Sequence, residues 1–499
     1  MPSTPDLAPG PGQPALDRSF FGHPRGLSTL FFTEMWERFS YYGMRALLIL
    51  FMTASVASGG LGFDTAKAGA IYGLYTAGVY LMALPGGYLA DRLLGQQRSV
   101  FVGGVLIAAG HFAMVFHAVA TFYLGLVLII LGTGLLKPNI SAIVGDLYGR
   151  EDERRDAGFS IFYMGINVGG FAAPLLCGYL GEEVDWHLGF GLAGVGMVAG
   201  LIQYVAGQRS LPEVGRLPQN PATPAEGRRI WTAVAATLAV AFAAAVAMGL
   251  GVFTVDVVKV ASVAVVLIAS AAALYFAYLL TAGGLDATEK RHVGAVAVLF
   301  VFSTFFWLGF EQSGSSMNLF ARDMTDRTIL GWEFPASWLQ FVNSAYLVLL
   351  APVFAALWLR IGRRQPSIPT KFALGLILLG AGFAVLARGA QLAADGTQVG
   401  IGWLATAYFL HTCGELCLSP VGLSTVTRLA PQRYASALMG VWFLSISLGS
   451  LIAGQIAGQV EAFSMTEIFL GIFVTTAAGG LVLLLLLRRR VIRWMAGAA

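Results

Sequence analysis

Charged residues are scarce in this sequence. Asp, Glu, Lys and Arg make up 12% of its 499 residues, against roughly 25% in ordinary soluble domains, and hydrophobic residues make up 57%. A soluble protein of this length is excluded, because so few charges cannot cover its core. The net charge of +4 comes from short basic segments rather than from one basic face, so nucleic acid is not expected as a partner.

Cysteine is also rare. The three cysteines, Cys177, Cys413 and Cys417, all lie in apolar segments. Their number and spacing exclude a disulfide framework and a cysteine-based metal site, and we expect them to be small packing residues. No metal and no cofactor are predicted.

Long apolar runs are abundant instead, for example AVAVLFVFSTFFWLGF (Ala295–Phe310). A helix of about 20 apolar residues crosses the hydrocarbon core of a bilayer. The sequence therefore predicts an all-α polytopic membrane protein with about fourteen transmembrane helices. The predicted spans are 27–54, 67–91, 98–117, 121–146, 157–180, 188–207, 230–251, 257–281, 292–320, 337–360, 371–389, 399–427, 434–457 and 466–487.

Polar segments divide these spans into groups. The N-terminal stretch is rich in Pro and Gly and lacks the basic and apolar regions of a signal peptide, so we expect a disordered tail. Most of the 31 basic residues fall in the tails and in alternate loops, whereas an opposite loop, GEEVDW, is acidic. This bias predicts that both termini are cytoplasmic. The predicted divisions are a tail (1–26), a six-helix bundle (27–207), a cytoplasmic linker (208–229), an extra helix pair with its connecting loop (230–290), a second six-helix bundle (291–487) and a basic cytoplasmic tail (488–499).

The two predicted bundles resemble each other in sequence. INVGGFAAPLLCG (Ile166–Gly178) aligns with ISLGSLIAGQIAG (Ile446–Gly458), and other Pro and Gly positions recur at a similar offset. Two parallel six-helix repeats are the plan of major facilitator transporters. The helix pair between the bundles lies outside the repeat.

The first predicted span, which includes FFTEMWERFSYYGM, carries several charges. Glu34, Glu37, Arg38, Tyr41 and Arg45 follow a helical spacing that places them on one face. The alternative is a polar face at the membrane surface. Apolar residues continue on both sides of the cluster, however, so we expect it to face the interior of a bundle.

Three further charges stand alone in apolar spans: Lys137, Glu311 and Glu415. Any one of them could form a structural ion pair between helices. Seven charges on four helices are more than pairing requires, and the four acids outnumber the three bases. A buried carboxylate without a cation tends to hold a proton, as a proton-moving protein requires.

The same charges suggest a zwitterionic substrate. Arg45 or Lys137 could bind a carboxylate while Glu415 binds an ammonium group. The Pro and Gly residues of GELCLSPVG are predicted to break the helix and free backbone carbonyls for the same ammonium. Aromatic residues such as Tyr41, Tyr42, Tyr80, Trp307 and Trp442 could line side-chain pockets, although each could equally be a packing or membrane-interface residue.

Several of these motifs resemble one family. EMWERFSYYG (34–43) resembles the ExxER motif of the proton-dependent oligopeptide transporters, a branch of the major facilitator superfamily. FSIFYMGINVGGFAAPLLCGYL (159–180) resembles the family's fifth-helix signature, and GELCLSPVGLS (414–424) resembles its tenth-helix motif. GGYLADRLLGQQR (86–98) is similar to the loop motif of the wider superfamily. The extra helix pair is similar to that of bacterial members.

The resemblance implies roles for individual residues. Gating would use two pairs between the bundles, Arg45 with Glu311 outside and Lys137 with Glu415 inside. The implied proton-coupling residues are Glu34, Glu37, Arg38 and Glu311. The implied substrate-binding residues are Arg45, Tyr42, Tyr80, Lys137, Asn167, Trp307, Asn343, Glu415 and Trp442.

The sequence and the resemblance together predict a symporter in the bacterial cytoplasmic (inner) membrane that imports di- and tripeptides with protons by alternating access. The expected partners are di- and tripeptides, protons and the lipid bilayer. One alternative is a proton-driven drug or organic-anion carrier, since such proteins share the loop motif. A membrane enzyme or receptor is a third possibility, but no catalytic grouping is evident in the sequence, and no enzyme activity is expected.

Overall fold

The computed structural model describes residues 17, 19–148, 152–211, 213, 215–250 and 252–496. Most of the predicted tail 1–26 lies outside this part. Eleven helical spans among these residues are long and apolar enough to cross a membrane. With the more polar helices α1, α4 and α14 they make the fourteen helices that the sequence predicts.

The described residues up to the linker form seven α-helices. Turns of 3-10 or π type extend several of them. The helices are α1 (Arg25–Thr53), α2 (Thr65–Leu81), α3 (Ala83–Leu89), α4 (Gln96–Ala113), α5 (Val119–Asp146), α6 (Arg155–Tyr179) and α7 (Trp186–Gly207).

The described residues after α7 form ten α-helices and four two-residue strands. The helices are α8 (Pro224–Gly249), α9 (Val257–Thr281), α10 (Ala287–Phe310), α11 (Ser316–Asp323), α12 (Phe341–Ile361), α13 (Ile368–Leu392), α14 (Gly402–Leu429), α15 (Ala435–Ala457), α16 (Met465–Val482) and α17 (Arg488–Met495). The strands are β1 (Thr325–Asp326), β2 (Thr328–Ile329), β3 (Trp332–Glu333) and β4 (Val399–Gly400), in the pairs β1–β4 (parallel) and β2–β3 (antiparallel).

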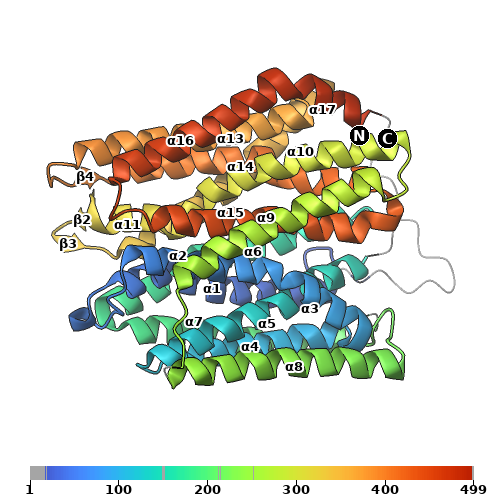
Figure 1. Cartoon of the computed structure of the whole chain (residues 1–499), viewed down its shortest axis with the longest axis horizontal. Helices are drawn as coiled ribbons and strands as arrows, with labels where there is room; N and C mark the ends of the chain where they lie inside the picture. Colours follow the sequence, from blue (N-terminus) through green and yellow to red (C-terminus); the bar gives the residue numbers. More distant parts are fainter. Residues whose placement is uncertain are drawn as a thin grey trace.

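Figure 1 shows α1 to α7 in one layer and α10, α11 and α13 to α17 in the other, with their axes roughly aligned. Strands β2, β3 and β4 lie at one end of the molecule, which we name the strand end. Helix α17 lies at the opposite end. We name it the basic end, because Arg92, Arg433 and α17 belong to the basic loops and tail of the sequence.

Local sequence signals set where the helices begin. Asp286 and Glu289 form a capping box at the start of α10, and Ser464 and Glu467 form another at the start of α16. In each box two side chains satisfy backbone N–H groups that a first helical turn leaves without partners. Asp185 likewise caps α7. These caps lie in the short loops between the predicted spans.

Two predictions about helix breaks need correction. The predicted span 292–320 is interrupted: α10 ends at Phe310, a 3-10 turn covers Glu311–Gly314, and α11 starts at Ser316. The predicted break in GELCLSPVG is wrong, because α14 runs without interruption through this motif. A proline in a membrane helix removes one backbone hydrogen bond and often leaves the helix continuous.

The two layers touch closely where α2 crosses α15. A Cβ atom added to Gly69 would lie 2.3 Å from the backbone oxygen of Gly454, and one added to Gly454 would lie 2.3 Å from that of Gly69. Only glycine permits this backbone approach, as in other small-residue contacts between membrane helices.

The extra helices differ from each other: α9 packs on α2, α10 and α15, whereas α8 has no buried side chain among its described residues.

Candidate functional site

The charged face of α1 points into the protein, as predicted. Glu34, Glu37 and Arg38 are all buried. The Arg38 guanidinium donates to both oxygens of Glu37, from Nε to Oε2 and from Nη2 to Oε1, the latter at 2.6 Å. Its Nε also lies 3.6 Å from Oε1 of Glu34. One cation therefore serves two carboxylates, and Glu34 is held less closely, because its Oε2 is buried without a hydrogen bond.

Arg45 links α1 to the second half of the chain. Its Nη2 lies 3.1 Å from Oε2 of Glu311 and donates to Oγ of Ser313 at 2.7 Å. Its Nε donates to the hydroxyl of Tyr72 at 2.8 Å. The Arg45–Glu311 pair suggested by the family resemblance is thus formed here. The extra hydrogen bonds offset part of the cost of burying its two charges.

The 3-10 turn after α10 positions Glu311. The turn also brings Ser313 and Gly314 beside Arg45. A Cβ atom at Gly314 would lie 2.1 Å from the Tyr72 hydroxyl and 2.9 Å from Nε of Arg45. The absence of a side chain at Gly314 therefore lets the two halves close around the ion pair.

Lys137 and Glu415 do not form the second predicted pair in this structure. No described carboxylate lies within 4.0 Å of Lys137 Nζ, which sits 4.4 Å from the centre of the Tyr80 ring. Glu415 interacts with the amide of Asn343, and its Oε2 is buried without a hydrogen bond. Lys137, Asn343 and Glu415 are each partly exposed, so solvent reaches this middle region.

The other candidate residues differ in their surroundings. The Arg38 guanidinium lies 6.0 Å from the centre of the Tyr42 ring, and Asn343 donates to Thr412 at 3.0 Å. Asn167 donates to the carbonyl of Tyr163 in its own helix. Two further candidates are in packing contacts: Trp307 with Phe306 and Phe310, and Trp442 with Phe372.

Sequence reasoning missed three contributors to the site: Tyr72, Ser313 and Thr412. Each holds a charged or amide side chain by a hydrogen bond. Hydroxyl residues are common in membrane helices, so only proximity in sequence to Glu311 and Glu415 could have singled out Ser313 and Thr412. Nothing in the sequence singles out Tyr72, which reaches Arg45 from another helix.

All seven charges belong to one electrostatic network. Lys137 interacts over a longer range with Arg38, Glu37, Glu34 and Glu311, and Glu415 interacts with Glu311 and Arg45. The network offers separate cationic and anionic groups in a partly solvated region between the halves. It can therefore hold a zwitterion and exchange a proton at a carboxylate. Among the described residues no group of His, Cys, Asp or Glu side chains is arranged to hold a metal ion.

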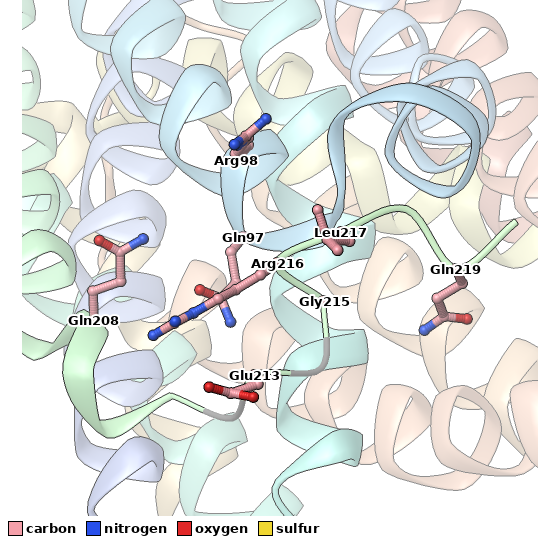
Figure 2. A pocket seen from close by; sticks show the side chains of 8 residues that line it. All are labelled: Gln97, Arg98, Gln208, Glu213, Gly215, Arg216, Leu217 and Gln219. Carbon is pink, nitrogen blue, oxygen red and sulfur yellow. The ribbon is translucent and has the colours of Figure 1, made fainter. Parts of the chain in front are cut away.

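A surface hollow lies apart from these charges. Figure 2 shows it between the start of α4 and the linker after α7. Its volume is about 650 Å³. Its lining includes Gln97, Arg98, Glu213 and Arg216. None of the candidate site residues lines it.

Solved structures with the same fold define the class of protein. The chain superposes with a TM-score of 0.90 on a crystal structure of a peptide transporter in complex with sulfate, at 43% identity, covering 97% of this chain and 98% of that one. A mutant of such a transporter in complex with alafosfalin gives a TM-score of 0.89 at 44% identity, covering 96% and 98%. The fold is thus that of a major facilitator transporter, with two six-helix bundles and two extra helices.

The family follows from the sequence comparisons. Residues 97–474 match the model of the POT family. The chain is 46% identical over 459 residues to the peptide transporter YePEPT of Yersinia enterocolitica, covering 89% of each chain. It is 40% identical over 479 residues to a di-/tripeptide transporter of Lactococcus lactis subsp. cremoris, covering 92% of this chain and 95% of that relative. This chain belongs to the POT family, the proton-dependent oligopeptide transporters.

Proposed function

We propose that this chain is a symporter that carries di- and tripeptides into the cell together with protons. The observation that carries the proposal is the set of seven charges between two bundles, five of them buried and two, Lys137 and Glu415, partly exposed, with both signs available to a zwitterion. The relatives named peptide transporters and di-/tripeptide transporters support the same substrate class.

The proposed location is the bacterial cytoplasmic membrane, with lipid around the fourteen spans and both termini in the cytoplasm. The basic end then faces the cytoplasm and the strand end faces outward. The bundles 27–207 and 291–487 would move relative to each other, joined by the linker 208–229 and the helix pair 230–290. The tails 1–26 and 488–499 would lie in the cytoplasm.

In this scheme the structure represents the state that is closed outside. The Arg45–Glu311 pair and further hydrogen bonds join the halves towards the strand end, including Asn318 to Ala46 at 2.8 Å. The partly exposed Lys137 and Glu415 would release peptide towards the basic end. In the opposite state these two residues would pair and close the inner side.

The proposed division of labour follows the contacts. Lys137 and Arg45 would bind the peptide carboxylate, while Glu415, Asn167 and Asn343 would bind its amino terminus. Tyr42, Tyr80, Trp307 and Trp442 would shape the pockets for side chains. Glu34, Glu37, Arg38 and Glu311 would couple the proton, with Glu34 the first candidate to carry it because Glu37 already accepts two hydrogen bonds from Arg38. The titrations of Glu34 and Glu37 would remain coupled, because both carboxylates share Arg38.

Uptake of labelled dialanine into liposomes tests the proposal. With an inward proton gradient, wild-type protein should accumulate the peptide above its outside concentration, and an uncoupler should abolish the accumulation. Unlabelled dipeptides should compete, whereas organic anions without an ammonium group should not. Competition by such anions alone would favour a drug or organic-anion carrier. The absence of any gradient-driven solute accumulation would favour a receptor or enzyme.

A further inference from the structure

The acidic segment GEEVDW reaches across to the other half of the protein at the strand end. Glu182, in the π turn Leu180–Val184 after α6, accepts hydrogen bonds from two backbone N–H groups. Its Oε2 accepts from Ala336 at 2.8 Å, and its Oε1 accepts from Ser337 at 2.9 Å. Both donors belong to the second half of the chain, and neither Glu182 nor this turn has a part in the site described above.

These two donors form the start of a long helical segment. Residues 336–361 comprise a 3-10 turn that continues directly into α12. The residue before it, Pro335, provides no side-chain cap. The first N–H groups of a helix lack partners within it and carry partial positive charge. Glu182 therefore provides, from the other half of the protein, the anionic cap that this helix lacks.

The end of α6 and the start of the 336–361 segment lie in close contact. A Cβ atom at Gly178 would lie 2.2 Å from Oγ of Ser337, so the glycine leaves room for the helix start. The next residue, Trp338, donates its indole N–H to the carbonyl of Leu175 at 2.9 Å. The start of the 336–361 segment is thus fitted against the end of α6.

We propose that Glu182 is a latch at the strand end, a positioning residue that stabilises the outside-closed state by capping the 336–361 helix across the two halves. Opening this end to admit a peptide separates Glu182 from Ala336 and Ser337. Hydrogen bonds to a charged group contribute more than neutral ones, so loss of the charge at Glu182 should shift the equilibrium between the closed and open states about tenfold. The latch differs from the Arg45–Glu311 pair, because it makes no contact with the proposed peptide or proton groups.

The test compares Glu182→Gln with Glu183→Gln, whose carboxylate is exposed on the neighbouring residue. Spin labels on exposed strand-end positions, Val56→Cys in one half and Leu330→Cys in the other, report the opening in full-length protein in lipid. The native cysteines are buried, and a sample without the two added cysteines measures their background labelling. We expect Glu182→Gln to raise the ratio of open to closed molecules about tenfold, whereas Glu183→Gln leaves it unchanged.

A second variant removes the interaction from the other side. Ala336→Pro eliminates one donor at the first position of the helical segment, where proline is tolerated. It should open the strand end in the same way, and combining it with Glu182→Gln should add less than the sum of the two effects. Glu182→Asp, which keeps the charge, should restore part of the closed population. If Glu182→Gln and Ala336→Pro both leave the label distances at their wild-type values, the latch is refuted, whatever happens to the melting temperature.

The kinetic readout rests on the proposed transport function. More outward-open molecules should lower the KM for external peptide and slow the maximal rate, because the competent state is more populated but closes less readily. A purely structural role would lower both stability and rate without lowering KM. If wild-type protein fails to transport peptides but the label distances still respond to Glu182→Gln, the proposed function fails and the latch stands. If transport is normal and the label distances do not respond to Glu182→Gln, the proposed function stands and the latch is refuted.

Discussion

The strand end and the basic end of this transporter differ in how its two halves meet. At the strand end, hydrogen bonds and an ion pair cross from α1 and from the π turn after α6 to the second half of the chain. Further towards the basic end, Lys137 faces an aromatic ring and Glu415 faces an amide, and both are partly exposed. The same kinds of residue are paired at one level of the protein and unpaired at another. The charges that pair across the halves, Arg45 and Glu311, hold them together, whereas Lys137 and Glu415 remain available to a substrate.

The largest expected effect comes from removing the cation that serves two buried carboxylates. Arg38→Gln leaves Glu34 and Glu37 without a counter-charge, which costs about 3–5 kcal/mol for a buried pair. We expect loss of gradient-driven uptake and a clearly lower melting temperature. Arg388→Gln, at an exposed site where Arg388 donates to Gln391, is the matched control. Uptake above half of the wild-type rate in Arg38→Gln would show that the cluster is not required.

The next largest effect is expected at Lys137, which has no ion-pair partner among the described residues. Lys137→Gln removes the proposed cation for the peptide carboxylate, so the KM for dialanine should rise about 10- to 100-fold, in line with a charged hydrogen bond of about 1.5–3 kcal/mol. The variant should also lose the preference for dialanine over its C-terminal amide. Lys259→Gln, at the exposed start of α9, should change neither the KM for dialanine nor this preference. If Lys137→Gln keeps the preference for dialanine over its amide, another residue binds the peptide carboxylate.

A smaller effect is expected from adding a methyl group beside the Arg45–Glu311 pair. Gly314→Ala places a methyl group against the Tyr72 hydroxyl and Arg45. This should weaken the outside-closed state and slow uptake several-fold, visible as a longer distance between strand-end spin labels. Gly471→Ala, where no atom lies within 4 Å of the added carbon, should be neutral. Equal behaviour of the two variants would mean that the Gly314 contact is unimportant for closure.

The smallest expected effect comes from a single hydroxyl. Tyr72→Phe removes the hydrogen bond to Arg45, which is worth about 1 kcal/mol or roughly fivefold in an equilibrium. Initial uptake rates should fall by no more than that factor, and the exposed Tyr88→Phe should match wild type. Because the clash at Gly314 is mainly with this hydroxyl, Tyr72→Phe should partly rescue Gly314→Ala. Strictly additive effects would contradict this reading of the contact.

The sequence was informative where physical signals are local. Long apolar runs predicted the spans, and helical spacing placed Glu34, Glu37 and Arg38 on one buried face. Contacts between halves were harder to predict, because they depend on how two bundles dock. The family resemblance suggested Arg45–Glu311, but nothing local indicated that Tyr72 and Ser313 would join it.

One error and one prediction still to be tested concern features that depend on neighbouring helices. The Lys137–Glu415 pair, which the family resemblance implies for the inner gate, stays a prediction for the opposite state of the transport cycle, since the two residues do not pair here. The helix break was expected at the Pro and Gly of α14 and instead lies at Glu311–Gly314. Breaks in membrane helices depend on whether neighbouring groups satisfy the freed backbone, which the sequence of one helix does not reveal.

The most direct test of coupling through the charged set is a comparison of wild-type protein and Glu311→Gln in the same liposomes. The glutamine has the same shape but cannot take up and release a proton or pair with Arg45 as an anion. Peptide exchange between equal concentrations inside and outside should persist, while accumulation of dialanine driven by a proton gradient should be lost. Accumulation at the wild-type level in Glu311→Gln would contradict the account.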